Sequence, residues 1–261
     1  MKRKQIKRYL KKRMRNIEQY ALLIMYNGDK EAIHQFRVEF KKLRAFVRLV
    51  GLGSSAKKKL KVPSKLKKIY KYAGSVRDLQ IYYDHITPFY NKKDGYPHQV
   101  LRQIAIAKCS LLITLKYFHF RRVIKQMRRN APNRVSKKRL ERFIQKKSQA
   151  IDRLIETDTQ DTRLHVLKKQ LKDVLYTLKI FHPPVQNHFP IAGKMSLYEL
   201  NKLSDILNDY LDWVVGITLL NAALLTRLSL HDKDILKGIR KRWRIRKAEA
   251  MALVKGNLFH T

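Results

Sequence analysis

Cysteine, glycine and proline are all scarce in this chain. A single cysteine, Cys109, occurs among 261 residues, together with 9 glycines and 7 prolines. One cysteine excludes an internal disulfide framework and any cysteine-rich zinc site, and it is typical of a protein from a reducing compartment. The combined share of glycine and proline is about half the usual one, which excludes collagen-like and linker-like chains and disfavours a turn-rich β-sandwich.

Long hydrophobic runs are also missing. The most apolar stretch, residues 213–225, is interrupted by Thr218 and Asn221, and it is shorter than the roughly 20 residues that span a bilayer. The first apolar stretch, residues 21–26, lacks the length and the small-residue cleavage site of a signal peptide. We therefore expect a soluble, cytoplasmic protein in which residues 213–225 form a buried helix.

Negative charge is the third scarcity. The chain has 20 acidic residues against 59 basic ones, a formal net charge of +39 at pH 7. Because 44% of the residues are hydrophobic, a core can form, but the surplus positive charge destabilises the compact state by self-repulsion. A polyanion would offset this repulsion, and three classes fit: nucleic acid, an anionic membrane surface or a chain of phosphates. The alternative is a generally cationic surface with no particular ligand.

Turn signals divide the chain into eight long segments without the period-two alternation of strands. The breaks fall at 27–29, 51–55, 91–97, 130–133, 157–162, 182–190 and 228–232. Asp29 and Ser136 are predicted helix N-caps, and Ser196 with Glu199 has the spacing of a capping box. The sequence therefore predicts an all-α protein of eight helices.

Two of these segments, residues 33–50 and 164–181, resemble each other at an offset of 131 residues. Six apolar positions of the first match six apolar positions of the second. The matching polar positions pair His34 with His165, Arg37 with Lys168, Lys41 with Lys172, and Arg48 with Lys179.

The segments that follow also match, now at an offset of 134, where Asp78 is paired with Asp212. Two matches in the same order indicate an internal repeat. We therefore expect two pseudo-repeated four-helix halves, about 1–130 and 131–261, packed as bundles in a single domain that spans residues 1–261.

The repeated segments carry a stripe of basic residues. On a helical wheel of 3.6 residues per turn, the stripe of the first segment occupies an arc of about 80° that borders the apolar face. Its members are His34, Arg37, Lys41, Arg44 and Arg48, and those of the second segment are His165, Lys168, Lys172 and Lys179. Neighbouring cations destabilise a helix, and an extended anion lying along the row would reverse that effect. The alternative is an ordinary snorkelling edge of an amphipathic helix.

Both histidines could pack against the core or contact phosphate directly. Metal ligation is disfavoured because no second histidine or carboxylate stands at a ligand spacing in both halves. Asp78 and Asp212 are predicted to hold a neighbouring Lys or Arg side chain by a salt bridge. Further basic residues are candidates from the fourth and eighth segments: Lys108, Lys116, Arg121 and Arg242.

The motifs together resemble the CHAD family, the conserved histidine α-helical domain. The stretch from His34 to Arg44 resembles the family signature, and Val76-Arg77-Asp78-Leu79 resembles its Arg-Asp motif in the next helix. The segment beginning Leu164-His165 resembles the second copy, and residues 203–212 the segment after it. The resemblance covers essentially the whole chain.

This resemblance implies two four-helix bundles around a basic central groove or pore. It implies binding of inorganic polyphosphate without catalysis and without a cofactor, in the cytoplasm and in association with polyphosphate granules. The residues at family motif positions are His34, Arg37, Lys41, Arg44, Arg77, His165, Lys168 and Lys172. Lys168, Leu175, Gln80 and Asn208 depart from the residues usual in the family.

Three other functions remain as alternatives to polyphosphate binding. An RNA-binding or other nucleic-acid-binding protein fits the charge and the 13 tyrosines and 10 phenylalanines. An enzyme acting on phosphoanhydrides is disfavoured because the sequence has no P-loop string and no clustered carboxylates for Mg²⁺. Binding to a membrane surface is disfavoured because the basic stripe borders a face that helices should bury.

Overall fold

The computed structural model describes residues 1–52, 60–91, 95–155, 160–181 and 195–259. In these ranges the chain is almost entirely helical, with one isolated bridge between Lys2 and Arg134 and no β-strand. The helices are α1 (Arg3–Asn27), α2 (Lys30–Val50), α3 (Ser64–Ile86), α4 (Gly95–Lys116), α5 (Phe120–Arg129), α6 (Lys137–Ile155), α7 (Asp161–Phe181), α8 (Leu197–Leu224) and α9 (Leu230–Phe259), with a 3₁₀ turn η2 (Thr87–Phe89) after α3. The all-α prediction is confirmed.

The predicted number of eight helices is wrong, because the described residues form nine. The fourth predicted segment divides into α4 and α5 at residues 117–119. Phe118 and Phe120, each 7% exposed, both turn into the core, with their ring centroids 4.6 Å apart. A continuous helix would separate residues two apart by about 200°, so the chain must leave the helix for both rings to be buried. No glycine, proline or asparagine marks this turn in the sequence.

The predicted caps are confirmed. The Asp29 carboxylate accepts hydrogen bonds from the backbone N–H groups of Glu31 and Ala32. The Ser196 hydroxyl accepts from the N–H of Glu199, whose carboxylate accepts in return from the Ser196 N–H. Ser136 accepts from the N–H of Arg139 at 3.2 Å. These side chains satisfy backbone donors that the first turn of a helix leaves free.

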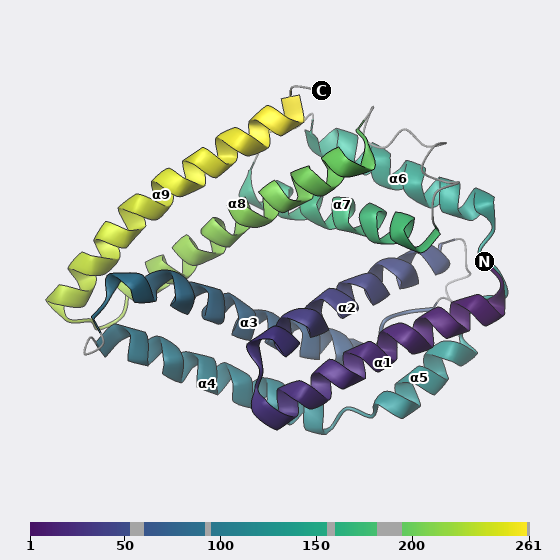
Figure 1. The fold of residues 1–261 in the computed structure, drawn as a ribbon, viewed down its shortest axis with the longest axis horizontal. Coiled ribbons are helices and arrows are strands. Elements are labelled where there is room, and N and C mark those ends of the chain that lie inside the picture. Colours follow the sequence, from purple (N-terminus) through teal and green to yellow (C-terminus); the bar gives the residue numbers. More distant parts are fainter. Residues whose placement is uncertain (53–59, 92–94, 156–159, 182–194, 260–261) are drawn as a thin grey trace.

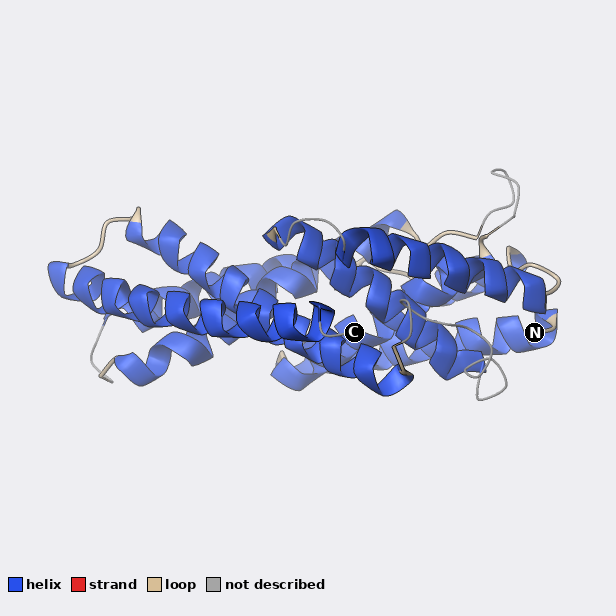
Figure 2. Cartoon of the chain, turned by 90° about the horizontal axis from the view of Figure 1, so that it is seen from above, coloured by secondary structure: helices blue, strands red, loops and turns tan. Residues whose placement is uncertain are grey.

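The helices surround a central opening (Figure 1). In sequence order α1 packs on α2, α2 on α3 and α3 on α4, and likewise α6 packs on α7, α7 on α8 and α8 on α9. Contacts of α2 with α7 and of α3 with α8 join the two sets, so these four helices border the opening. Seen from above, the molecule is much longer than it is thick (Figure 2).

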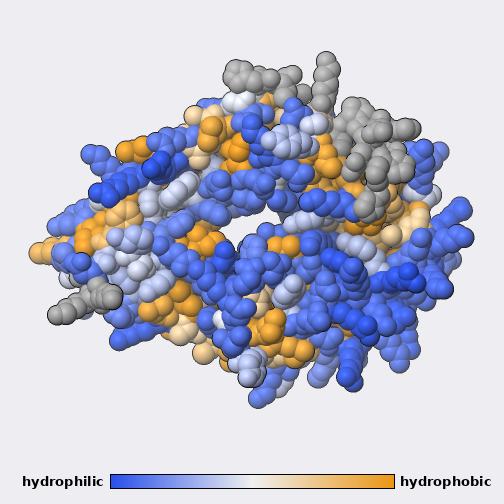
Figure 3. Space-filling view, viewed as in Figure 1, coloured by the Kyte–Doolittle hydropathy of each residue, from blue (hydrophilic) through white to orange (hydrophobic). Residues whose placement is uncertain are grey.

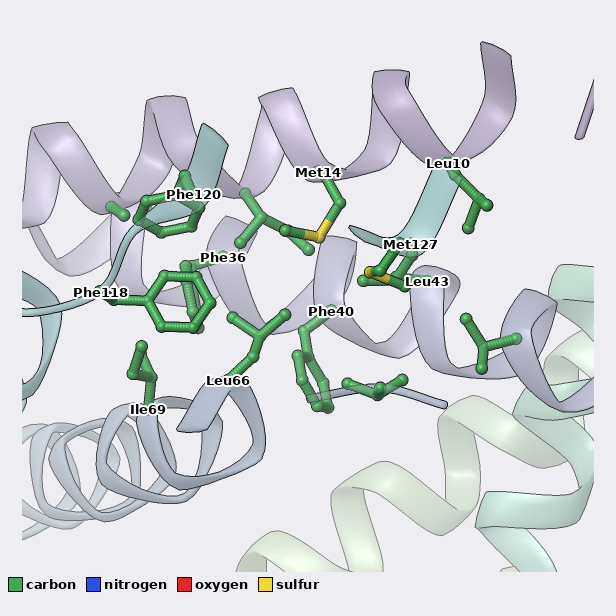
Figure 4. Packing of buried hydrophobic residues seen from close by; sticks show 14 of the residues in the cluster. Leu10, Met14, Phe36, Phe40, Leu43, Leu66, Ile69, Phe118, Phe120 and Met127 are labelled. Carbon is green, nitrogen blue, oxygen red and sulfur yellow. The ribbon is translucent and has the colours of Figure 1, made fainter. Parts of the chain in front are cut away.

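Three hydrophobic clusters hold this arrangement together. The first joins α1, α2, α3, the second half of α4 and α5, and the labelled side chains of Figure 4 point toward one another there. The second joins α6, α7, α8 and the end of α9. The third joins the far ends of α3 and α4 to those of α8 and α9, around Tyr82, Leu220 and Trp243. Because the clusters lie outside the opening, polar faces of the helices remain free to line it.

The apolar stretch 213–225 forms the second half of α8, ending one residue beyond it. Its Leu220 is fully buried, whereas Trp213 is half-buried and Leu225 is 90% exposed. The prediction that this stretch forms a buried helix is therefore correct for one face of the helix and wrong for the end of the stretch. No helix within the described residues has the length and apolar character needed to cross a membrane.

Leu49 connects α2 to the cluster formed by the second set of helices. It is fully buried and belongs to the cluster whose other members come mainly from α6, α7, α8 and α9, and α2 contacts α7 and α6. We expect Leu49→Ala to lower the free energy of unfolding by about 2–5 kcal/mol, because the lost side chain leaves a cavity at the join. Urea denaturation followed by circular dichroism measures this. Leu22→Ala is the matched control, since Leu22 is 56% exposed and its truncation should cost less than about 0.5 kcal/mol. Equal effects in both variants would contradict the assigned join.

Candidate functional site

A cavity of about 410 Å³ occupies the centre of the molecule. The space-filling view shows an opening there that passes through to the other side, with a mainly hydrophilic rim (Figure 3). The side chains come from the four helices that border the opening. They are Arg37, Lys41, Arg44, Tyr70, Asp78, His165, Val166, Lys168, Lys169, Lys172, Leu211, Asp212 and Val215.

The α2 wall of the cavity follows from the pattern of that helix. Its apolar residues, including Phe36, Phe40 and Leu43, are buried in the first cluster. Burying this face turns the neighbouring arc of the helix, with Arg37, Lys41 and Arg44, toward the cavity. Residues at spacings of four and three lie one turn apart on the same side of a helix.

Tyr70 of α3 holds the two arginines of this wall. The Arg37 guanidinium carbon lies 5.1 Å from the centroid of the Tyr70 ring, and that of Arg44 lies 5.7 Å away. The ring is itself stacked on Phe40, with centroids 4.2 Å apart and an interplanar angle of 15°. Cation–π contacts of this kind fix guanidinium groups without neutralising them. The core thus positions the guanidinium groups of Arg37 and Arg44 at the edge of the cavity.

The α7 wall contributes His165, Lys168, Lys169 and Lys172. One of these has a carboxylate partner: the Lys172 ammonium lies 3.4 Å from Asp205, a residue that is itself largely exposed. Exposed ion pairs contribute little free energy, so Lys172 remains available to a ligand. Three members of each predicted row therefore line one cavity: Arg37, Lys41 and Arg44 of the first, and His165, Lys168 and Lys172 of the second.

Burial and the neighbouring positive charges together lower the pKa of Lys41 to about 7. Burial is the main cause, followed by the positive charges of Arg37 and Lys168. Burial also lowers the pKa of Lys168, together with the charge of Lys172 and against the opposing effect of Asp212. An anion in the cavity would favour the charged form of each lysine, because opposite charges stabilise each other at short range.

Asp78 and Asp212 also line the cavity, from α3 and α8. Burial raises the pKa of Asp78, the charge of Arg37 lowers it, and the charge of Asp212 raises it further. Neither carboxylate is within ion-pair distance of a Lys or Arg side chain among the residues described. The direct salt bridge predicted for them is therefore absent among the described residues, and an orienting role through space stays a prediction.

The two histidines have different surroundings. His165 is exposed at the cavity, whereas His34 is half-buried and is not among the lining residues. Burial lowers the pKa of His34, and the nearby charge of Arg77 lowers it further. Burial also lowers the pKa of His165, with Lys168 acting in the same direction. Arg77 lies beside His34 and, like it, does not line the cavity.

Other predicted phosphate-binding residues lie elsewhere in the structure. Arg48 pairs with Asp173 of α7, which is only 3% exposed in its side chain and also pairs with Lys147. Lys179 lines a second cavity. The remaining four lie on other surfaces of the molecule. Lys108 lies beside Gly28, Lys116 over the ring of Tyr117 and Arg242 over the ring of Phe89, and Arg121 is exposed on α5.

These six candidates therefore do not line the central cavity, for two physical reasons, and their binding of phosphate stays a prediction. Arg48 lies on the same side of α2 as Arg37, Lys41 and Arg44, as its helical phase predicts. However, the cavity ends before the last turn of α2, where the Arg48 guanidinium forms an ion pair with the buried carboxylate of Asp173. The α4, α5 and α9 helices lie outside the four helices that border the cavity, so their cations cannot reach it.

Sequence reasoning missed Tyr70 and Lys169. The repeat contains no signal for either residue, because Lys169 matches Val38 at the offset of 131 and Tyr70 matches Ser204 at the offset of 134. Lys169 follows Lys168 by about 100° on the helical wheel, which extends the basic arc of α7 beyond that of α2.

The arrangement is suited to binding an anion with many negative charges. Six basic side chains face two carboxylates across a narrow cavity. Arginine offers fork-shaped pairs of donors to phosphate oxygens, and lysine offers point charges. Within the described parts of the chain, no three His, Cys, Asp or Glu side chains gather so that they could hold a metal ion.

Comparison with known proteins identifies the family. The family model for the CHAD domain matches residues 8–221, so the chain belongs to the CHAD family. A solved structure of the CHAD domain from the plant Ricinus communis is similar, with a TM-score of 0.75 and 14% identity over 98% of this chain and 91% of that one. PptA from Streptomyces chartreusis is similar with a TM-score of 0.68 and 10% identity, over 100% of this chain and 99% of that one. These likenesses show a shared fold. No curated protein matches the sequence.

Gly74 leaves the space that the Arg37 guanidinium occupies. A Cβ atom at this position would collide with Arg37 Nη1. We expect Gly74→Ala to leave the free energy of unfolding unchanged or slightly higher, because alanine favours a helix by about 1 kcal/mol and the arginine end can move. The displaced guanidinium should weaken binding of inorganic triphosphate by about threefold to tenfold.

Isothermal titration calorimetry measures the triphosphate affinity, and Gly238→Ala is the matched control. Gly238 lies within α9, where an added Cβ would meet nothing within 4 Å. Loss of stability in Gly74→Ala, or an affinity equal to that of the control, would contradict the proposed contact.

Proposed function

We propose that this CHAD domain binds inorganic polyphosphate in its central cavity, without catalysis. The observation that carries the proposal is the convergence of Arg37, Lys41 and Arg44 with the lysines of α7 on one open cavity. Burial, followed by the charges of Arg37 and Lys168, lowers the pKa of Lys41 there, and the six Lys and Arg side chains of the lining outnumber its two carboxylates. A chain of phosphates supplies that charge at closely spaced intervals. On this proposal the protein acts in the cytoplasm, at polyphosphate granules.

A linear polymer fits the shape of the site. The opening passes through the molecule (Figure 3), so a flexible phosphate chain can enter from one side and continue to the other. The basic residues lie on two facing walls, α2 and α7, and each wall can contact phosphate oxygens of the same chain. This geometry also supports a continuous path between the two rows.

RNA is the second candidate ligand, and the aromatic residues argue against it. Single-strand binders stack bases on exposed aromatic rings. Phe36 and Phe40 are buried in the core, with at most 1% exposed. Tyr70 is stacked on Phe40 and also lies against Arg37 and Arg44. None of these rings near the cavity offers a free face to a base.

The proposal that the domain does not catalyse a reaction rests on the kinds of side chain that line the cavity. Phosphoryl-transfer sites use carboxylates that hold Mg²⁺ and a group that activates the attacking nucleophile. The cavity has Asp78 and Asp212 as its two carboxylates, and burial raises the pKa of Asp78. The six surrounding cations suit retention of a phosphate chain.

Reversal of charge on the α2 wall tests the binding site. We expect the triple variant Arg37→Glu, Lys41→Glu and Arg44→Glu to lose polyphosphate binding by at least about a hundredfold, because three contacts become repulsive. The three residues border the core and do not form part of it, so circular dichroism should show unchanged helical content. Unchanged affinity with intact helices would contradict the cavity assignment.

Competition separates polyphosphate from RNA. At about 0.3 M salt, long-chain polyphosphate should displace a labelled single-stranded RNA of equal charge from the protein, whereas the RNA should not displace polyphosphate. A generally basic surface binds both through counterion release and shows little preference. Equal competition would therefore favour the nucleic-acid alternative.

The lowered pKa of Lys41 predicts that binding depends on pH. Lys41 is about half charged near pH 7 in the free protein, and bound phosphate favours the charged form, so its pKa is higher in the complex. Binding therefore takes up a proton, and affinity should fall as the pH rises from about 7 to 9, by at most about tenfold per unit. Calorimetry in buffers of different ionisation enthalpy measures the proton uptake. Lys41→Arg should flatten the profile, and an unchanged slope in that variant would refute the role of Lys41.

A further inference from the structure

A second basic cavity is built from α1, α2 and α7. Its volume is about 460 Å³, within the range of ordinary ligand sites. The basic side chains that line it are Arg8, Lys12, Arg13, Lys42 and Lys179. It shares no lining residue with the central cavity.

Part of this positive charge has no internal partner. Glu39, which is only 4% exposed, binds Arg13 at 2.8 Å and Lys42 at 2.7 Å. No carboxylate in the described ranges lies within ion-pair distance of Arg8, Lys12 or Lys179. The buried carboxylate thus accounts for two of the cations, and the other three are available to a ligand.

The face of α7 that lines the central cavity continues into the second one. Lys168 and Lys172 line the first cavity, and Tyr176 and Lys179 line the second. With His165, these residues occupy an arc of about 80° on the helical wheel, over a helix length of about 21 Å. One side of one helix therefore runs from the central cavity to the second.

Tyr176 lies where the two cavities approach each other. It lines the second cavity, and it is close enough to Tyr70 and Arg44 of the first to interact with them electrostatically. Along α7, Tyr176 follows Lys172 of the central cavity by one helical turn, a rise of about 6 Å.

We propose that the second cavity extends the phosphate-binding path along α7, so that one long polyphosphate chain occupies both cavities. This inference rests on the proposed function of the central cavity. A chain held in the first cavity reaches the second at a high effective concentration, which strengthens binding without any further binding partner. A short phosphate chain occupies one cavity alone and gains nothing. The two cavities together make the domain selective for long chains.

The test compares a long and a short probe on a variant of the second cavity. In the double variant Lys12→Glu and Lys179→Glu, both changed residues are exposed, so the fold should be retained. We expect the affinity for long-chain polyphosphate to fall at least about tenfold, because the variant loses the second point of attachment. The affinity for inorganic triphosphate at the central cavity should stay within about twofold.

The matched control is Lys125→Glu with Lys241→Glu. It makes the same change of net charge at exposed positions of α5 and α9 that line neither cavity. The control should retain the affinity of the unchanged protein for long chains within about twofold. Equal losses in the two double variants, or an equal loss for triphosphate and long chains, would overturn the inference.

The same measurements separate this inference from the proposed function. If the unchanged protein fails to bind long-chain polyphosphate, the proposed function itself is wrong. If charge reversal in the central cavity abolishes binding and the second-cavity variant behaves like its control, the central site stands and the extended path is wrong.

Discussion

The placement of like charges beside one another at the centre of the fold is the constraint on which the rest depends. Lys41 is largely buried among Arg37, Lys168 and other cations, and its pKa of about 7 records the cost of that arrangement. Proteins seldom bury cations without a counter-charge, because desolvation and repulsion both oppose it. The domain retains this arrangement because the two sets of helices, each with its own hydrophobic cluster, are joined on both sides of the opening, by α2 with α7 and by α3 with α8.

Packing interactions orient the basic side chains that this arrangement brings together. Phe40 in the core supports the ring of Tyr70, and that ring supports the guanidinium groups of Arg37 and Arg44. The absence of a side chain at Gly74 leaves room for one of them. A cavity whose donors are already oriented loses less conformational entropy when it binds a flexible anion. The core of the fold and the affinity of the site are therefore linked through a few aromatic contacts.

Much of this architecture could be predicted from the sequence, because helix caps and helical periodicity are local properties. The start of α2 at Asp29 and the inward direction of Arg37 both follow from such patterns. The turn at Phe118 could not be predicted, since it depends on burying two rings in a core formed by distant segments. The capture of Arg48 by Asp173 also depends on how α2 meets α7, and helical phase carries no information on that contact.

The central claim is that the rows on α2 and α7 hold one phosphate chain between them. A crystal structure of the domain in complex with long-chain polyphosphate tests it most directly. The account predicts continuous density for a phosphate chain in the opening, with oxygens within hydrogen-bond distance of Arg37, Lys41 and Lys172. Density confined to the outer faces of α4, α5 or α9, beside an empty central cavity, would contradict it.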